Sequence, residues 1–295
     1  MASRLRSSSS SSSMPSSVAE MSDHSPGEAT LIDDGGGYRV TWTAPTAPVA
    51  PTALTALAAP VGRSTARMIV APRFTPAPVA QSFWCNLDPR LVMLSDPDSA
   101  RAAGFRQLRE CVLTRGMPRV LTVTSASPGD GKTTCATNLA LAFAEQTREK
   151  LLLLDANFFA PALASMFSID EYAPAAPPHA LPWSAPFKLT SLTPRLDLAT
   201  IVLARGEALP RVDHEHLVRL LGSFLRSGYD RILLDAPALE GSPSVSRLLD
   251  VADGVLLAVR AGHTNERALR RAVDQVGPRK MMGAALMDSR LDSGR

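Results

Sequence analysis

The fold of this chain is decided by the stretch Ala126-Ser127-Pro128-Gly129-Asp130-Gly131-Lys132-Thr133. It follows a short β-rich run, Val120 to Ser125, and precedes a helical pattern from Lys132 to about Gln146. Small residues in such a loop let successive backbone N–H groups point inward around an anion, at the positive end of the following helix. A plain Gly/Pro turn between strand and helix is the alternative. The strand–loop–helix context favours a phosphate-binding loop over that turn.

The stretch matches the Walker A pattern of nucleotide-binding loops, with Ala126 at the first position, where glycine is commoner. Lys132 would supply a mobile positive charge to the β- and γ-phosphates, and the Thr133 hydroxyl would ligate Mg²⁺. We therefore expect ATP and Mg²⁺ as cofactors. The residues predicted to bind the nucleotide are Ser127, Pro128, Gly129, Asp130, Gly131, Lys132, Thr133 and Thr134.

Two carboxylates follow apolar runs further along the chain. Asp235 ends the run Arg231 to Asp235 and has the form of a Walker B carboxylate, which holds Mg²⁺ through water. Asp155 follows the run Leu151 to Leu154 and could coordinate Mg²⁺ or orient the nucleophile that attacks the γ-phosphate. Capping of the turn after a core strand is the alternative for both. The predicted metal ligands are Thr133, Asp155 and Asp235, and the predicted catalytic residues are Lys132, Asp155 and Asp235.

Alternating strand and helix patterns predict the fold class. Helical spacing is found at Ser99 to Leu113, at His216 to Arg226 and from about Thr264 to Gly277, and an apolar strand is expected at Val255 to Val259. Wholly apolar strands separated by helices indicate an α/β fold of the P-loop NTPase kind, a parallel sheet with helices on both faces. Ligands bind such sheets at the carboxyl ends of the strands. The loop and the two aspartates all belong to such ends, so three separate segments predict one site.

Composition divides the chain into two parts. Residues 1–86 are rich in serine, proline and alanine and cannot bury enough apolar surface to offset ordering entropy, so this segment is predicted to be largely disordered. Two short β-like pieces within it, Tyr38 to Thr43 and Arg67 to Ala71, are candidates for docking segments. Residues 87–290 are predicted to form the P-loop nucleotide-binding domain. A proline-dense insert at 173–187 carries no motif that indicates a role.

Charge, hydropathy and cysteine content limit the classes of function. The net charge is only +3, so there is no broad electrostatic basis for nucleic-acid binding, and none is expected. No stretch reaches the roughly 18 to 20 continuous apolar residues that a membrane helix needs. Cys85, Cys111 and Cys135 have no CxxC spacing and are expected to be free thiols in a reducing cytosol. The expected location is cytoplasmic, with recruitment to the inner face of the membrane by a partner left open.

Several stretches share the pattern of one protein family. They are Asp88 to Val92, Phe105 to Arg109, Thr124 to Thr134, Leu152 to Ala156, Tyr229 to Pro237 and Ala252 to Gly262. Together they resemble the cytoplasmic bacterial tyrosine kinases of capsule and exopolysaccharide synthesis, which are related to septum-placing and chromosome-partitioning ATPases of the MinD and ParA type. The resemblance covers about Leu87 to Asp288. It implies phosphoryl transfer from ATP as the activity.

One position separates the two branches of this resemblance. The partitioning ATPases carry a second lysine early in the loop, which reaches the partner's nucleotide across a dimer. The corresponding residue here is Ser127, and it is followed by the Pro128-Gly129 form of the polysaccharide kinases. The loop therefore favours the kinase branch over the partitioning branch.

The chain departs from the kinase pattern at groups that the kinase reaction uses. Family members usually have a second aspartate and then an arginine after the first aspartate of the Asp155 motif, where this chain has Asn157, Phe158 and Phe159. No tyrosine cluster ends the chain, whose tyrosines are Tyr38, Tyr172 and Tyr229. Self-phosphorylation of a C-terminal tail, the family's usual regulatory device, therefore has no acceptor in this sequence.

Two further departures concern assembly and base recognition. The family's oligomerising motif, Glu-x-x-Arg-x-x-Arg, keeps Arg106 and Arg109 but has Ala103 in place of its glutamate. An intersubunit ion pair made by that glutamate cannot form, and homo-oligomerisation is left open. Met287 stands where the family often has an asparagine near the adenine, which predicts looser recognition of the base.

The sequence therefore favours an ATP-binding protein of exopolysaccharide or capsule biosynthesis that binds and hydrolyses ATP–Mg²⁺ to regulate polysaccharide synthesis or export. ATPase activity is expected, and protein-tyrosine kinase activity is left open. The resemblance implies a membrane polysaccharide co-polymerase, or chain-length regulator, as partner. Two alternatives remain. One is a catalytically weak, nucleotide-gated binding module for that partner, and the less favoured one is a partitioning ATPase.

Overall fold

The computed structural model describes residues 87–116, 118–169, 187–201, 214–242 and 245–287, together with short pieces at 28–30, 41–43 and 76–78 and residue Trp84. Residues 1–86, which are predicted to be largely disordered, and the proline-dense insert at 173–187 fall almost wholly outside the described residues. Of the candidate docking pieces, only β2 is described, within Tyr38 to Thr43. No helix in the described ranges combines the length and the apolar character that a membrane crossing requires.

The helices and strands follow one another in the alternating order that the sequence predicts. The helices are α3 (Val92–Ser95), α4 (Ala100–Thr114), α5 (Lys132–Gln146), α6 (Leu163–Met166), α7 (His214–Arg226), α8 (Val245–Val251) and α9 (Glu266–Val276). The strands are β1 (Glu28–Thr30), β2 (Thr41–Thr43), β3 (Ala77–Pro78), β4 (Val120–Ser125), β5 (Leu151–Asp155), β6 (Phe187–Thr193), β7 (Leu196–Ile201), β8 (Arg231–Asp235), β9 (Gly254–Arg260) and β10 (Met281–Met287).

The main sheet has eight strands in the order β10-β9-β4-β8-β5-β7-β6-β3. From β10 to β7 each strand runs parallel to the next, so the predicted parallel sheet is confirmed over these strands. The sequence did not predict β7 or the edge beyond it, where β6 runs antiparallel to β7 and the short β3 pairs with β6. A two-residue turn, 194–195, joins β6 to β7, because antiparallel neighbours can be linked by a hairpin.

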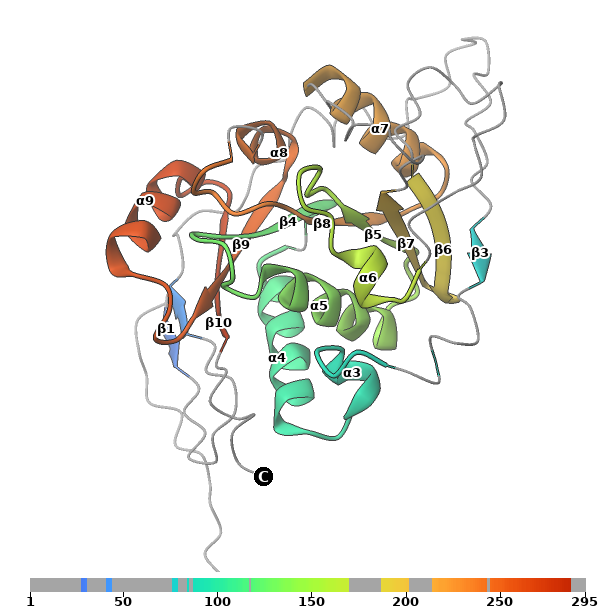
Figure 1. The fold of residues 1–295 in the computed structure, drawn as a ribbon, viewed down its shortest axis with the longest axis horizontal. Coiled ribbons are helices and arrows are strands. Elements are labelled where there is room, and N and C mark those ends of the chain that lie inside the picture. The colour runs from blue at the N-terminus through green and yellow to red at the C-terminus, as the bar shows by residue number, and fades with distance from the viewer. Residues whose placement is uncertain are drawn as a thin grey trace, which may run out of the picture.

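Helices cover both faces of this sheet, with α3, α4 and α5 on one side and α7 and α8 on the other (Figure 1). The leucine run of β5 shows why both faces are apolar. Leu151 and Leu153 belong to the cluster with α4 and α5, whereas Leu152 and Leu154 pack with α7. Successive side chains of a strand point to opposite faces, so a strand buried on both faces has no polar alternation. The predicted α/β class with helices on both faces is confirmed.

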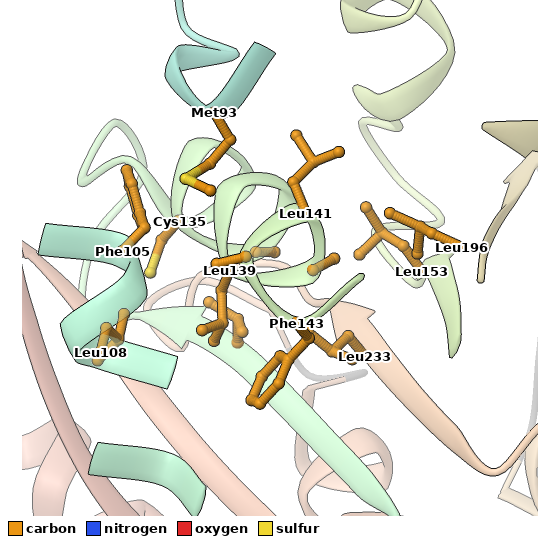
Figure 2. Packing of buried hydrophobic residues seen from close by; sticks show 14 of the residues in the cluster. Met93, Phe105, Leu108, Cys135, Leu139, Leu141, Phe143, Leu153, Leu196 and Leu233 are labelled. Atoms are coloured by element: carbon orange, nitrogen blue, oxygen red, sulfur yellow. The ribbon is translucent and has the colours of Figure 1, made fainter. Parts of the chain in front are cut away.

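Helix α5 is central to the first of these clusters. Leu139 and Phe143 are almost fully buried, and they pack among Met93 of α3, Phe105 of α4 and Leu233 of β8 (Figure 2). Burial of a large apolar side chain contributes about 1.5 to 3 kcal/mol. The helix that begins in the predicted loop is therefore fixed rigidly against the sheet.

Two predicted helix boundaries shift by one or two residues for identifiable reasons. Helix α4 begins at Ala100, because Ser99 is its N-cap and accepts a hydrogen bond from Ala102 N at 3.2 Å. Helix α9 begins at Glu266 and not near Thr264, because Asn265 caps it through Ala268 N at 2.8 Å.

Candidate nucleotide-binding site

The predicted loop joins β4 to α5 and adopts a backbone that only glycine accommodates easily at two positions. Gly129 has φ of 86° and Gly131, the N-cap of α5, has φ of 88°. A side chain in this left-handed region costs roughly 1 to 2 kcal/mol. The first hydrogen bond into the helix runs from Cys135 N to Gly131 O at 2.8 Å. The N–H groups of residues 132–134 therefore have no partner within the helix, which makes this helix start suited to an anion.

The predicted nucleotide-binding residues differ in their exposure. Pro128 and Gly129 are exposed at the tip of the loop, whereas Asp130 is fully buried below it. Lys132 and Thr134 are half-buried and Thr133 is buried, all in the first turn of α5. The loop therefore has an exposed outer edge and an anchored inner side.

Asp235 lies at the carboxyl end of β8 and is fully buried. Neither of its carboxylate oxygens has a hydrogen-bond partner among the residues that the structure describes. Burial raises the pKa of Asp235 to about 7, helped by the negative charge of Asp155 and opposed by the Thr133 hydroxyl and the Lys132 charge. The Thr133 hydroxyl is thus close to Asp235, although the two side chains do not form a hydrogen bond.

Asp155, at the carboxyl end of β5, is equally buried, but both of its carboxylate oxygens accept hydrogen bonds. Its Oδ1 accepts a hydrogen bond from Asn157 N at 3.1 Å, and its Oδ2 accepts from Ala162 N at 2.9 Å and Leu163 N at 3.0 Å. Burial raises the pKa of Asp155 to about 6, against the opposing effect of these bonds and of the Lys132 charge. Asp155 therefore caps the turn before α6, the alternative role that the sequence left open.

The structure brings the predicted catalytic residues together. Asp155 and Asp235 occupy paired positions in the register of β5 and β8. The charge of Lys132 lowers the pKa of both carboxyl groups, which means that it lies near both. The carboxyl ends of two parallel strands and the start of one helix meet at the same edge of the sheet, as the sequence predicted.

These residues fit the predicted magnesium ion at one carboxylate. Mg²⁺ prefers oxygen ligands, keeps several waters and is usually held by one or two carboxylates together with substrate phosphates. Asp235 supplies a buried carboxylate that has no hydrogen-bond partner in the described part of the chain and lies beside the Thr133 hydroxyl, and a metal would balance its charge. No cluster of three or more metal-binding side chains occurs in the described part of the chain, so a site formed by protein ligands alone is not found there. Binding of Mg²⁺ by Asp155 stays a prediction.

The residues that replace kinase-pattern groups have structural partners. Asn157 donates from Nδ2 to Ala160 O at 2.7 Å and accepts from Ala160 N at 3.3 Å, so its side chain closes the turn after β5. Phe159, two residues on, is 67% exposed beside that turn. Met287 packs toward Gly131, whose added Cβ would lie 3.4 Å from the methionine Cγ.

The two arginines of the oligomerising motif are engaged within the chain. Arg106 forms a bidentate pair with Glu145 of α5, with N···O distances of 2.7 and 2.8 Å. Arg109 is 4% exposed and donates from Nη1 to Ala142 O at 2.8 Å. Both guanidinium groups therefore connect α4 to the last turn of α5, where cations suit the helix carbonyls.

Tyr229 is unsuited to phosphorylation in this fold. It is 3% exposed, and its hydroxyl donates to Asp197 Oδ2 at 2.7 Å. Burial, together with the hydrogen bond and charge of Asp197, raises the pKa of Tyr229 far above its usual value. The other tyrosines, Tyr38 and Tyr172, lie outside the described residues.

Comparison with known proteins identifies the relatives of the chain. No protein-family model matches it. A curated relative, the tyrosine-protein kinase YwqD of Bacillus subtilis, is 25% identical over 214 residues, which are 68% of this chain and 86% of the relative. The chain is a homologue of a bacterial tyrosine kinase. This kinase homologue has the glycine-containing loop before α5 and the two strand-end carboxylates described above.

Solved structures agree in fold. The VpsO kinase domain is 25% identical with a TM-score of 0.50, and the match covers 63% of this chain and 94% of that domain. The kinase domain of the Escherichia coli tyrosine kinase ETK has a TM-score of 0.53 and 16% identity, with 75% of this chain and 92% of that domain covered. At that identity, the second match supports the fold alone. The kinase-like α/β fold of the chain is established.

The sequence did not predict four residues whose side chains contact the loop. Glu240 accepts from Ser127 Oγ at 2.9 Å, and Arg260 Nη1 donates to Gly129 O at 3.4 Å. His263 and Thr264 contact Asp130 at 2.9 and 2.7 Å. They lie more than 110 positions away in the chain. The only local pattern that could have indicated these contacts is the polar turn before α9, and such a turn is equally typical of a helix N-cap.

Proposed function

We propose that the chain binds ATP with Mg²⁺ at the loop between β4 and α5 and hydrolyses the nucleotide. The observation that carries this proposal is the buried carboxylate of Asp235, which has no described partner and lies close to Thr133. A buried ionised carboxylate is costly unless it is paired or coordinates a metal. A nucleotide-bound Mg²⁺ ion provides that counter-charge.

Each site residue has a defined task in this proposal. The backbone N–H groups at the start of α5 and the Lys132 ammonium bind the phosphates, and Thr133 with Asp235 holds the metal. Mg²⁺ supplies neutralisation of the charge that develops on the phosphates during transfer. Asp155 orients the attacking water. Its two oxygens offer about four lone-pair sites, of which three backbone N–H groups use three.

The proposed cellular role is regulation of capsule or exopolysaccharide synthesis or export, with a membrane co-polymerase as partner. The homology to a tyrosine kinase and the likeness to the VpsO kinase domain support the kinase-like class from which this role is inferred. We place the protein at the inner face of the membrane through that partner. Phosphoryl transfer to tyrosine on another protein is compatible with the same site.

The test is ATP turnover by wild-type protein and by Lys132→Met, measured as phosphate release in the presence of Mg²⁺. We expect turnover in the wild type and background release in the variant, because Lys132 carries the charge that meets the phosphates. Equal background rates in both proteins would remove the hydrolysis claim. Mass spectrometry for phosphotyrosine after incubation with ATP–Mg²⁺ separates hydrolysis from kinase activity.

A second candidate function is a nucleotide-gated binding module without useful turnover. The observation that favours it is that the side chains of Asp155 and Asn157 form hydrogen bonds within the turn before α6. These bonds give both side chains a structural role in the turn. Tight ATP binding without phosphate release, together with ATP-dependent capture of the co-polymerase, would favour this function over hydrolysis.

A further inference from the structure

The turn between β9 and α9 lies against the loop between β4 and α5. His263 is 45% exposed, and its Nδ1 is 2.9 Å from Asp130 Oδ1. The hydroxyl of Thr264 donates to the same oxygen at 2.7 Å. Its Oγ1 also accepts a hydrogen bond from Arg260 N at 2.8 Å, which fixes the hydroxyl on the turn itself. Two neighbouring side chains of one turn therefore meet one carboxylate of the loop.

Asp130 carries this contact into the loop backbone. Its side chain is fully buried, and its other oxygen, Oδ2, accepts a hydrogen bond from Ser127 N at 2.9 Å. Three donors thus surround one buried carboxylate, and two of them come from a turn more than 130 positions away. A buried carboxylate that loses donors costs more than an exposed one, so Asp130 would rotate toward water without them.

Rotation of Asp130 would change the loop on both sides. Ser127 N would lose its acceptor, and Asp130 lies between the two glycines that hold left-handed backbone conformations. The imidazole also lies beside Gly129, since a Cβ added there would lie 3.4 Å from His263 Cε1. The conformation that directs the loop N–H groups inward is therefore held partly by the β9–α9 turn.

We propose that His263 and Thr264 are positioning residues for the phosphate-binding loop and act through Asp130. Their role in this proposal is to hold the loop and not to bind the phosphates. A carboxylate only accepts hydrogen bonds, so Nδ1 of His263 carries a hydrogen and donates it to Asp130. The inference rests on the proposed function for its effect on ATP, but its effect on the loop itself is independent of any nucleotide.

The chain allows matched variants at both positions. His263→Asn keeps an amide N–H near the place of Nδ1, whereas His263→Ala removes the donor and His263→Gln moves the amide further out. Thr264→Ser keeps the hydroxyl and Thr264→Val removes it at nearly constant shape. The side chain of His263 is partly exposed, so we expect its variants to fold. Thermal unfolding of each variant without nucleotide checks this.

The experiment has two readouts on the full chain. The first is hydrogen–deuterium exchange of the 126–131 segment without nucleotide, and the second is the Kd of ATP–Mg²⁺ by calorimetry. We expect His263→Ala and Thr264→Val to speed exchange in that segment and to weaken ATP binding by about ten-fold, since a hydrogen bond to a charged group is worth that much or more. His263→Asn and Thr264→Ser should behave as the wild type, and His263→Gln as His263→Ala.

Unchanged exchange of the 126–131 segment in both His263→Ala and Thr264→Val would overturn the inference. Equal losses in His263→Ala and His263→Asn would overturn it as well, because the donor would then not be the cause. If the exchange pattern is as expected but the wild type binds no ATP, the positioning role stands and the proposed function fails.

Discussion

Replacement of Asp235 by asparagine is expected to stabilise the nucleotide-free protein at alkaline pH while it removes a metal ligand. The folded-state pKa of Asp235 is about 7, above the ordinary value of 3.8, because the group is fully buried beside Asp155. The folded protein therefore binds more protons than the unfolded chain between these two pKa values. Stability then falls as the pH rises through this window and is level above it.

The magnitude follows from the same pKa. Each pH unit in the window changes the free energy of unfolding by about 1.4 kcal/mol, so the part of the window from about pH 5 to about pH 7 corresponds to about 3 kcal/mol. The asparagine has a constant cost, because a buried amide without a partner costs about 1 to 3 kcal/mol at every pH. The difference in the free energy of unfolding between the two proteins therefore changes with pH only through the ionisation of Asp235.

The assay is urea unfolding of wild type and Asp235→Asn at about pH 5 and about pH 8, without nucleotide or metal. We expect the wild type to lose about 3 kcal/mol more than the variant between the two pH values. The same loss in both proteins would exclude a raised pKa at Asp235, because this carboxyl group would then be ionised at low cost in the folded state.

Three further predictions concern the loop and the core. Gly131→Ala should lower the free energy of unfolding by about 1 to 2 kcal/mol and weaken ATP binding. Gly116 has φ of 81° and no neighbour near an added Cβ, so Gly116→Ala should lower the free energy of unfolding by a similar amount and leave ATP binding unchanged. Equal ATP affinity in the two variants would contradict the role of the loop. Tyr229→Phe should lower the free energy of unfolding by about 1 to 2 kcal/mol through loss of its bond to Asp197, without changing any phosphotyrosine signal; a lost signal would place the acceptor at Tyr229. Asn138→Ala should cost about 2 to 3 kcal/mol in urea unfolding, because its side chain holds the entry segment through the backbone of residues 90 and 93, and a cost near zero would contradict this.

The sequence predicted the parts of the fold that local patterns determine. Apolar runs such as Leu151 to Leu154 are typical of strands buried on both faces, and the glycine loop is typical of the junction between a strand and a helix start. These patterns predicted the parallel sheet and the meeting of Asp155 with Asp235 at one edge of it. The antiparallel β6 escaped prediction, because it follows the proline-dense insert and is placed by pairing with β7. Strand direction at a sheet edge depends on tertiary contacts, which no local pattern contains.

The hydrogen-bond partners of buried polar side chains could not be predicted from the sequence, because they too depend on tertiary contacts. Asp155 and Asp235 have the same local pattern, yet one accepts three backbone hydrogen bonds and the other accepts none from described residues. The difference arises from the turn of residues 156–162, which folds back over β5. His263 and Asp130 likewise meet only because β9 lies next to β4 in the sheet.

The central claim is that the loop and Asp235 together hold ATP with Mg²⁺. The most direct measurement is the affinity of wild type and Asp235→Asn for ATP, with Mg²⁺ and with a chelator in its place. We expect Mg²⁺ to strengthen ATP binding by about ten-fold or more in the wild type, and we expect this gain to be lost in the variant while metal-free binding persists. An equal gain from Mg²⁺ in both proteins would contradict it.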